Sequence, residues 1–365
     1  MSSLPLWSYA VVLGASLLLS LFLTPLALAL ALRLRILDHP APNKAHTTAV
    51  PYLGGAAIVV AFAAVVLVAA GIDPPSAGLG QLVAFMGLGV LLALVGLADD
   101  VRGGISPWLR LLLEAAAGAV IWALGDSAQV AGVPSWGNAL LSIVWIVGVT
   151  NAFNLLDNMD GLSAGVASVA ALSIFGIAAL QHRYLVAALA VALAGCAAGF
   201  LRHNFHPARI YMGDAGSLFL GFVVAVLCLK LRENAPTRVP IAVILAVPGV
   251  ALFDTALVLV SRLLHHRNPM NGGQDHSSHR LVRLGCTVRQ AVGLTYLAAA
   301  LLGAAAIGMS RLGHVIRVGG VVGLALAGAL AAVVLGRVPI YDVEERTPAS
   351  TVAPSAAPAA RSARG

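Results

Sequence analysis

The sequence predicts an all-α polytopic membrane protein, and three observations lead to this fold class. Hydrophobic residues make up 59% of the 365-residue chain, while charged residues make up only 10%. This composition is too apolar for a soluble protein of this length. Apolar runs of about 18 to 25 residues recur along the chain, and each is long enough to span a bilayer core of roughly 30 Å.

Eleven apolar segments are expected to form membrane-spanning helices. The first lacks a preceding basic stretch and is too long for a signal peptide, so it should remain as an anchor. The ninth contains Pro240 and Pro248, which predict a kinked or split helix. The segments cover residues 8–32, 53–71, 80–98, 107–125, 137–156, 161–180, 184–201, 215–231, 239–264, 290–309 and 314–336.

Basic residues are distributed unevenly between the loops on the two sides of these segments. Sixteen arginines and lysines fall on one side and six on the other. Because cytoplasmic loops carry an excess of basic residues, the first side is expected to be cytoplasmic. The N-terminus is then outside and the C-terminus cytoplasmic. The net charge of +7 reflects this topology rather than nucleic-acid binding.

The chain is expected to form one transmembrane domain over residues 1–340, followed by a disordered cytoplasmic tail over 341–365. The tail is rich in alanine, proline and serine and cannot bury a core. Cys196, Cys228 and Cys286 show no paired spacing, so neither a disulfide nor a zinc site is assigned to them.

The stretch NAFNLLDNMDGLSAG closes the fifth segment and carries Asn151, Asn154, Asp157 and Asp160 within ten residues. In a continuous helix the last three would lie along one face. Polar clusters at membrane depth mark ion or substrate sites, because ionised groups are costly in hydrocarbon. For Asp160 alone, a cap for the following helix is the alternative interpretation.

Polar residues also border the neighbouring segments. Asp99 and Asp100 end the third segment, where they could bind magnesium through water, accept a proton or form a solvated helix end. Arg110 lies just inside the fourth segment and could contact a phosphate or snorkel to the membrane surface. Asp214 precedes the eighth segment, where it could bind a metal ion beside a phosphate or cap the helix.

Two histidines and an intramembrane acid complete the polar set. Asp254 lies within the ninth segment and should face the protein interior, with Arg262 as a structural partner in the simpler interpretation. His276, His279 and Arg280 in the last cytoplasmic loop could donate hydrogen bonds to phosphate or sugar oxygens. Zinc binding and attraction to anionic lipid are the alternatives for this loop.

Acids, amides and imidazoles are expected to meet in one cavity at the cytoplasmic face. Carboxylates in a basic frame favour a magnesium-dependent site for a phosphorylated substrate. The motifs NKAH…PxxGG, ADD, NxxNxxDxxDGL and GDxGS, the aspartate of the ninth segment and a last loop with histidines follow one another between about Asn43 and Gly285. In type and order they resemble the polyprenyl-phosphate N-acetylhexosamine-1-phosphate transferase superfamily.

The resemblance implies an enzyme that transfers N-acetylhexosamine-1-phosphate from a UDP-N-acetylhexosamine to a polyprenyl phosphate such as undecaprenyl phosphate. UMP is released, and the lipid-linked diphosphate sugar starts cell-envelope polysaccharide synthesis. The resemblance also implies Mg²⁺, or Mn²⁺ in its place, at a site in the bacterial inner membrane. Because members of the superfamily are often dimers, it further implies a homodimer.

The resemblance also implies a role for each matching residue. Asp214 is the expected metal-binding aspartate, with Asn154 as the second ligand. Tyr211 stands where an aromatic ring can stack on uracil. Asp99 would deprotonate the lipid phosphate, with Asp100 as a supporting acid. The catalytic set is Asp99, Asp100 and Asp157, and the substrate-binding set is Lys44, Arg110, Asn151, Asp160, Tyr211, Asp254, His276, His279 and Arg280.

The sequence departs from the family pattern at three places. Asn158 replaces a usual glycine and is expected to alter only backbone freedom. Arg110 replaces a common lysine and has a different donor geometry. The last loop lacks the triple histidine of the muramoyl-pentapeptide branch, which favours UDP-N-acetylglucosamine as the donor. Muramoyl-pentapeptide transfer, a transporter for a charged solute and a scaffold protein are the alternatives, although no internal repeat supports a transporter.

Overall fold

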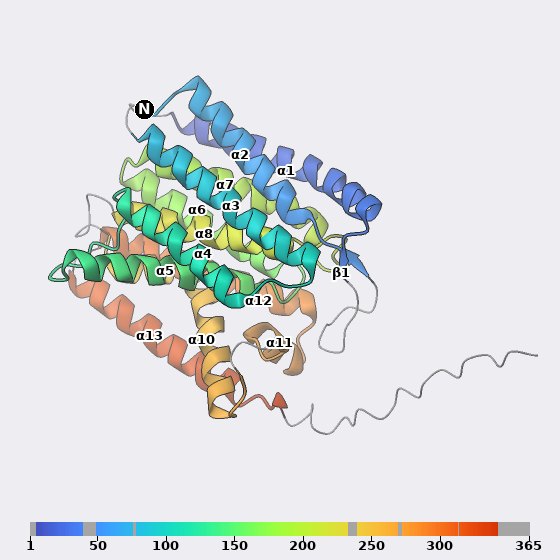
Figure 1. Cartoon of the computed structure of the whole chain (residues 1–365). Helices are drawn as coiled ribbons and strands as arrows, with labels where there is room; N and C mark the ends of the chain where they lie inside the picture. Colours follow the sequence, from blue (N-terminus) through green and yellow to red (C-terminus); the bar gives the residue numbers. More distant parts are fainter. Residues whose placement is uncertain are drawn as a thin grey trace, which may run out of the picture.

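The computed structural model describes residues 5–38, 49–75, 78–232, 239–268, 272–312 and 314–341. Thirteen helices and one small sheet make up this part of the chain (Figure 1). Lys44 and residues 342–365 of the predicted tail lie outside the described residues. The helices are α1 (Leu6–Leu34), α2 (Gly54–Ile72), α3 (Leu79–Arg102), α4 (Pro107–Ala123), α5 (Ser135–Leu156), α6 (Leu162–Leu180), α7 (Tyr184–Asn204), α8 (Gly213–Arg232), α9 (Ile241–Ala246), α10 (Gly249–Leu264), α11 (Ser277–Arg283), α12 (Val288–Arg311) and α13 (His314–Gly336).

Each of the eleven apolar segments is helical in the structure. Within the described residues, nine helices are long and apolar enough to cross a membrane. Helix α4 is shorter, with 17 residues. The ninth segment is divided at Pro248 into α9 and α10, which confirms the predicted split. Proline cannot donate a backbone hydrogen bond inside a helix, so the chain breaks there. The eleven crossings and the orientation stay predictions.

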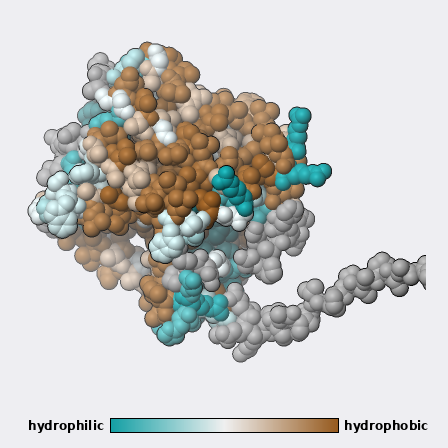
Figure 2. Space-filling model, viewed as in Figure 1, coloured by the Kyte–Doolittle hydropathy of each residue, from teal (hydrophilic) through white to brown (hydrophobic). Residues whose placement is uncertain are grey.

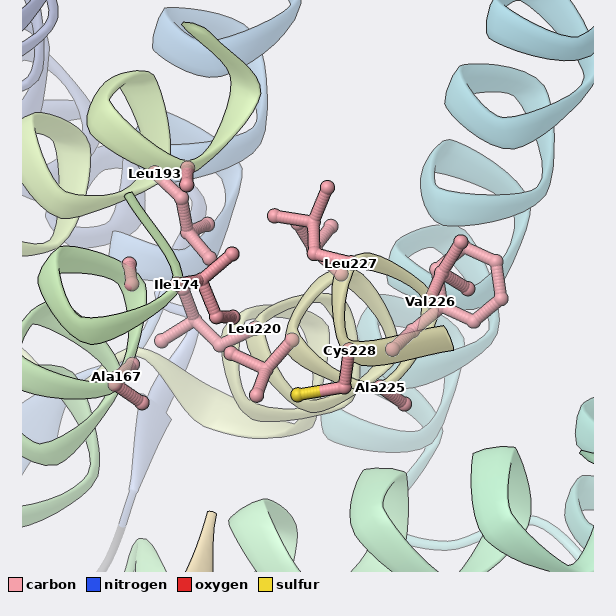
Figure 3. Packing of buried hydrophobic residues seen from close by; sticks show 14 of the residues in the cluster. Ala167, Ile174, Leu193, Leu220, Ala225, Val226, Leu227 and Cys228 are labelled. Atoms are coloured by element: carbon pink, nitrogen blue, oxygen red, sulfur yellow. The ribbon is translucent and has the colours of Figure 1, made fainter. Parts of the chain in front are cut away.

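Helix α8 lies at the centre of the bundle, where 94% of its apolar window is buried inside the protein. It contacts α2, α3, α5 and α6. Figure 3 shows its side chains reaching toward their neighbours, with Leu220 of α8 close to Ile174 of α6. Cys228 in this helix and Cys196 in α7 are buried within the hydrophobic core. This tightly packed helix carries Asp214 in its first turn.

The outer helices present apolar side chains to their surroundings. None of the apolar window of α13 is buried inside the protein, and only 22% of that of α1 is. Figure 2 shows a broad hydrophobic flank, with hydrophilic side chains gathered toward the right and lower edges. Large exposed apolar surfaces of this kind are favourable against lipid and unfavourable against water. The chain is therefore a multi-pass membrane protein.

A two-stranded antiparallel sheet interrupts the helical fold, and the sequence analysis did not predict it. It pairs β1 (Leu37–Asp38) with β2 (Val50–Pro51). The chain continues into Tyr52, which forms a parallel bridge with Tyr211. The amide of Gly54 then donates to the Tyr211 carbonyl at 3.0 Å. These bonds tie the start of α2 to the loop that leads into α8.

Candidate active site

Four helix ends bring polar side chains together at one end of the bundle, around Arg110 of α4. The Nη1 atom of Arg110 is 2.8 Å from Asp214 Oδ2 and 3.6 Å from Asp99 Oδ2. Its Nη2 atom donates to the amide oxygens of Asn151 and Asn154, at 3.1 and 3.0 Å. Side chains from α3, α5 and α8 thus surround a single guanidinium.

Glu114 lies one turn further along α4 and is fully buried. Its Oε1 is 3.5 Å from Arg110 Nε, and its Oε2 accepts a hydrogen bond from Asn151 Nδ2. A buried carboxylate needs a charged partner, because removing an isolated ion from water is costly. Glu114 thus pairs with Arg110 and helps to fix the position of its guanidinium. It is absent from the predicted site residues, although its i, i+4 spacing from an arginine was a sequence signal for the pair.

Both carboxylate oxygens of Asp214 are engaged. Oδ1 accepts from Asn154 Nδ2 at 2.8 Å, and Oδ2 accepts from Arg110 Nη1. The same Asn154 nitrogen lies 3.0 Å from Ser217 Oγ, one turn along α8. The Asp214 side chain is therefore directed to α4 and α5, and the interpretation of this residue as a helix cap is wrong.

The cap of α8 is supplied instead by Asp100, at the end of α3. Its Oδ1 accepts the Asp214 amide at 3.0 Å, and its Oδ2 accepts the Ala215 amide at 3.3 Å. Carboxylates favour helix N-termini, where amides are unpaired and the dipole is positive. Gly213 permits this approach, since its φ is +67° and a Cβ there would lie 2.3 Å from Asp100 Oδ2. Asp100 therefore holds the start of α8 in place, and its role as a supporting catalytic acid stays a prediction.

The turn after α5 carries two of the predicted acids. Helix α5 ends one residue before Asp157, so Asn154, Asp157 and Asp160 do not share a continuous helical face as predicted. Asp160 Oδ2 accepts from His206 Nδ1 at 2.8 Å and from the Ala208 amide at 3.0 Å. Asp160 therefore joins this turn to the loop before α8 and does not cap α6.

Asp157 lies among like charges. Burial, together with the nearby carboxylates of Asp214, Asp100 and Asp160, raises the pKa of Asp157 well above its usual value. Within the described residues its carboxyl accepts no hydrogen bond. A cation beside this carboxyl would offset both the repulsion and the cost of burial.

Tyr211 borders the same turn. Burial raises the pKa of Tyr211, and the carboxylates of Asp160, Asp38 and Asp157 add to the shift. The backbone of Tyr211 is fixed by the bridge to Tyr52. An aromatic ring beside acidic side chains suits a planar base, which stacks on the ring while its N–H groups donate to the acids.

A second polar cluster forms where α10 meets the histidine loop, residues 272–283. Asp254 is only 1% exposed, which confirms that it faces the interior. Its Oδ2 is 2.7 Å from His276 Nδ1, and its Oδ1 accepts the Ser277 amide at 2.6 Å. Arg262 pairs with Asp275 rather than with Asp254, at 2.7 Å to each carboxylate oxygen. The proposed structural contact between Arg262 and Asp254 is therefore wrong.

Arg280 supports the histidine loop from within the protein. It is 1% exposed and donates to the Asp275 carbonyl at 2.9 Å, the Leu335 carbonyl at 2.9 Å and Ser261 Oγ at 2.8 Å. These bonds fix its guanidinium within the protein, and its role as a substrate ligand stays a prediction. Tyr341, assigned by sequence to the start of the tail, donates to Asp275 Oδ2 at 2.8 Å and also belongs to this support.

His279 has a different environment. Its Nδ1 atom is buried and has no hydrogen-bond partner among the described residues. Burial, together with His276, whose ring centroid is 5.9 Å away, lowers the pKa of His279 to about 4. The ring is therefore neutral near pH 7. A buried polar atom without a partner is costly, so His279 is suited to a hydrogen bond with a bound molecule.

One hydrogen bond joins the two clusters. Ser278 Oγ donates to Asn158 Oδ1 at 2.6 Å, and Asn158 Nδ2 donates to the Leu155 carbonyl at 2.7 Å. Asn158 therefore ties the histidine loop to the turn after α5. The expectation that its replacement of a glycine changes only backbone freedom is wrong, because the side chain makes a contact that glycine cannot.

Comparison with known proteins identifies the family of the chain. A model described as Glycosyl transferase family 4 matches residues 81–232. A protein of Bacillus subtilis named as a probable undecaprenyl-phosphate N-acetylglucosaminyl 1-phosphate transferase is 33% identical over 291 residues, which cover 77% of this chain and 79% of the relative. The chain belongs to glycosyl transferase family 4. The predicted resemblance to the polyprenyl-phosphate N-acetylhexosamine-1-phosphate transferases is confirmed.

Two further family 4 relatives represent different branches. A decaprenyl-phosphate N-acetylglucosaminephosphotransferase of Mycolicibacterium smegmatis is 30% identical, over 81% of this chain and 80% of that protein. A phospho-N-acetylmuramoyl-pentapeptide-transferase of Heliobacterium modesticaldum is 32% identical, over 71% of this chain and 88% of that protein. The match to the N-acetylglucosamine branch covers more of this chain. With its apolar helices, this family 4 member is a multi-pass bacterial membrane protein.

The oxygen donors of this family 4 site suit magnesium better than zinc. Among the residues that the structure describes, no group of three histidines, cysteines or acids could hold a metal ion. Zinc in proteins takes three or four such ligands, whereas Mg²⁺ is often held by one or two carboxylates together with water and substrate phosphates. Asp214 and Asn154, with the Asp157 carboxyl beside them, provide this smaller set.

Proposed function

We propose that this protein transfers N-acetylglucosamine-1-phosphate from UDP-N-acetylglucosamine to undecaprenyl phosphate or another polyprenyl phosphate, with release of UMP. The observation that carries the proposal is the cluster of Asp99, Asn154 and Asp214 around Arg110. A guanidinium with acids and amides in one place suits a diphosphate and its counter-ion. The printed activities of the B. subtilis and M. smegmatis relatives support the same reaction class.

In the proposed reaction, an oxygen of the lipid phosphate attacks the sugar-proximal phosphorus of the donor. A P–O bond forms at that phosphorus while its bond to the UMP oxygen breaks, so UMP leaves and no redox partner is needed. Because the reaction exchanges one phosphoanhydride bond for another, we expect it to be readily reversible. Catalysis then depends on in-line positioning and on neutralisation of charge.

Asp99 and Arg110 act at the acceptor side. Asp99 Oδ1 accepts the Ile105 amide, while its Oδ2 faces Arg110. This hydrogen bond orients the carboxylate, which takes up the proton carried by the lipid phosphate. Arg110 moves from its acidic partners to the phosphate oxygens, because a fork of N–H donors matches them in geometry.

Asp214 and Asn154 would hold Mg²⁺, with Asp157 beside them. When bound, the ion supplies charge neutralisation on the diphosphate. Asn151 keeps its place as a neighbour of Arg110 and Glu114. Mn²⁺ also prefers oxygen donors and is expected to substitute.

The nucleotide lies toward the turn after α5 in this proposal. Asp160 and Tyr211 hold the uracil, while His276 and His279 contact the sugar or diphosphate. Asp254 fixes His276 through the 2.7 Å contact with its Nδ1. This order keeps the acceptor phosphate near Asp99 and the leaving UMP at the opposite end of the site.

Purified protein with Mg²⁺, UDP-N-acetylglucosamine and undecaprenyl phosphate tests the proposal. UMP and a lipid-linked sugar should appear together and in equal amounts. A panel of UDP-sugars then ranks the donors, and a preference for the muramoyl-pentapeptide donor would reassign the sugar while keeping the reaction. Flux of a charged solute without UMP would reject the enzyme in favour of a transporter.

We propose direct attack by the lipid phosphate rather than a route through a covalent intermediate on the protein. A single turnover with labelled donor, in the absence of lipid, should leave the protein unlabelled. Label on an aspartate under these conditions would establish an aspartyl-phosphate route instead.

Removal of the metal is expected to stop the reaction. Treatment with EDTA should abolish UMP release, and Mg²⁺ in excess of the chelator should restore it, because the crowded carboxylates cannot bind a diphosphate without a counter-ion. Initial rates measured across a Mg²⁺ titration check this. Full activity of the EDTA-treated protein, with residual metal excluded by elemental analysis, would contradict a metal requirement.

Substitution of His279 tests the histidine loop. Because the ring is neutral near pH 7, His279→Gln should keep more activity than His279→Ala, which we expect to lower kcat/KM for the UDP-sugar roughly tenfold or more. Steady-state kinetics at pH 7.5, more than three units above this pKa of about 4, measure this. His182→Ala, an exposed histidine at the α6–α7 turn, is the control. Unchanged kinetics in His279→Ala would remove the residue from the site.

A further inference from the structure

A cavity of about 580 Å³ lies where α7 ends and α12 begins, next to the loop before α8. Its volume is in the range of about 300 to 1,000 Å³ that ligand pockets occupy. None of its lining residues belongs to the proposed active site. The lining consists of Ala198, Leu201, Arg202, His203, Phe205, His206, Pro207, Arg209 and Arg289.

The polar part of this lining is basic throughout. Arg202, Arg209 and Arg289 are exposed, and no aspartate or glutamate lines the cavity. Among the described residues, the guanidinium groups of Arg202 and Arg209 have no hydrogen-bond or ion-pair partner. Arg289 Nε donates to the His206 carbonyl at 3.1 Å, which places it against the loop. This arrangement of cationic side chains is suited to an anionic ligand.

Asp160 reaches the cavity wall through His206 but does not pair with the arginines. Asp160 accepts from His206 Nδ1 at 2.8 Å, so its charge is directed to that imidazole and to the Ala208 amide. His203 Nε2 lies 3.2 Å from the Leu21 carbonyl of α1. The two histidines are thus engaged with the protein, and the three arginines face the cavity.

The remaining wall of the cavity is apolar. Ala198 and Leu201 lie in the last turns of α7, a helix long and apolar enough to span the membrane, and Phe205 follows directly. Phe205 is 38% exposed although it is a large hydrophobic side chain. Arginines at the end of a membrane helix lie at the interface, with apolar side chains on the hydrocarbon side.

We propose that this cavity binds the phosphate headgroup of an anionic phospholipid from the surrounding leaflet. Arg202, Arg209 and Arg289 donate to the phosphate oxygens, and the acyl chains run along Leu201 and Phe205. Basic pockets between membrane helices bind anionic headgroups through this combination of charge and apolar surface. A soluble phosphate would contact the arginines but would make no contact with the apolar wall.

Native mass spectrometry of the delipidated protein in detergent tests the proposal with phosphatidylglycerol as the probe. The variant with Arg202→Gln, Arg209→Gln and Arg289→Gln should bind this lipid about a hundredfold more weakly than wild type. Its matched control replaces Arg33, Arg35 and Arg337, which are exposed basic residues outside the cavity, by glutamine. The control should bind as wild type does.

Competing probes distinguish the sources of phosphate. Phosphatidylcholine should bind wild type no better than the triple variant, and millimolar inorganic phosphate should not displace phosphatidylglycerol. Equal binding of phosphatidylglycerol by the triple variant and wild type would overturn the proposal. Displacement of phosphatidylglycerol by inorganic phosphate, by the UDP-sugar or by a low concentration of undecaprenyl phosphate would also overturn the proposal. The cavity would then bind a soluble anion or a substrate. If the triple variant does not fold, Arg209→Gln in the exposed loop should still weaken binding about tenfold.

Discussion

Asp214→Asn is expected to lower the rate of UMP release roughly 10³-fold while the protein still inserts and folds. The substitution keeps the size of the side chain but removes the charge that faces Arg110 and, in our proposal, the metal ion. Preorganised charges in a site that excludes water contribute this much to a transition state. Initial rates at saturating donor, lipid and Mg²⁺ measure the effect, with thermal stability recorded on the same sample.

Asp73→Asn is the matched control for this change. Asp73 follows the last residue of α2, whereas the first residues of that helix are bonded to the loop before α8, so it lies at the far end of α2 from the site. Its substitution should leave the rate unchanged. A wild-type rate in Asp214→Asn, with an unchanged Mg²⁺ requirement, would contradict the assignment of Asp214 to the metal.

The helices could be predicted from sequence because their signal is local. A run of apolar residues long enough to span a bilayer is visible without knowledge of its neighbours, and Pro248 marks a break for a reason internal to the chain. The sheet has no such signal. Its strands have two residues each, and the adjoining bridge joins Tyr52 to Tyr211, so the pairing exists only once the fold has formed.

The residue types of the site were predictable, but their partners were not. Acids within membrane segments are costly, which singled out Asp254, while Asp99 and Asp214 stood out as acids at the ends of such segments. The capping of α8 by Asp100 joins residues more than a hundred positions apart, which no spacing rule reveals. The expected helical face from Asn154 onward failed because α5 ends before Asp157.

The sequence did not predict the polar contacts between loops either, because these contacts also join residues that are far apart in the chain. Asn158 stands where the family pattern has a glycine, and no role was predicted for Ser278, so considered singly neither suggests a contact. In the structure they share a hydrogen bond of 2.6 Å. Two side chains that suggest nothing individually in the sequence can therefore form one link between the turn after α5 and the histidine loop.

Arg110→Met is expected to impair both stability and turnover. Loss of the guanidinium leaves Glu114 buried without a cation, which should lower the free energy of unfolding by about 3 kcal/mol or more. It also removes the donor that faces Asp214, Asn151 and Asn154, and turnover should fall roughly 10³-fold. Thermal unfolding in detergent and UMP release measure the two effects separately.

The double variant Arg110→Met/Glu114→Gln separates these two contributions. A neutral glutamine no longer needs a buried cation and still accepts from Asn151, so most of the lost stability should return. Turnover should not return, because the phosphate oxygens still lack their donor. Arg110→Lys keeps the charge but loses the fork of donors, and should lower turnover only about tenfold. Recovery of both stability and turnover in the double variant would mean that Arg110 only neutralises Glu114, and the centre of the proposed site would have to lie elsewhere.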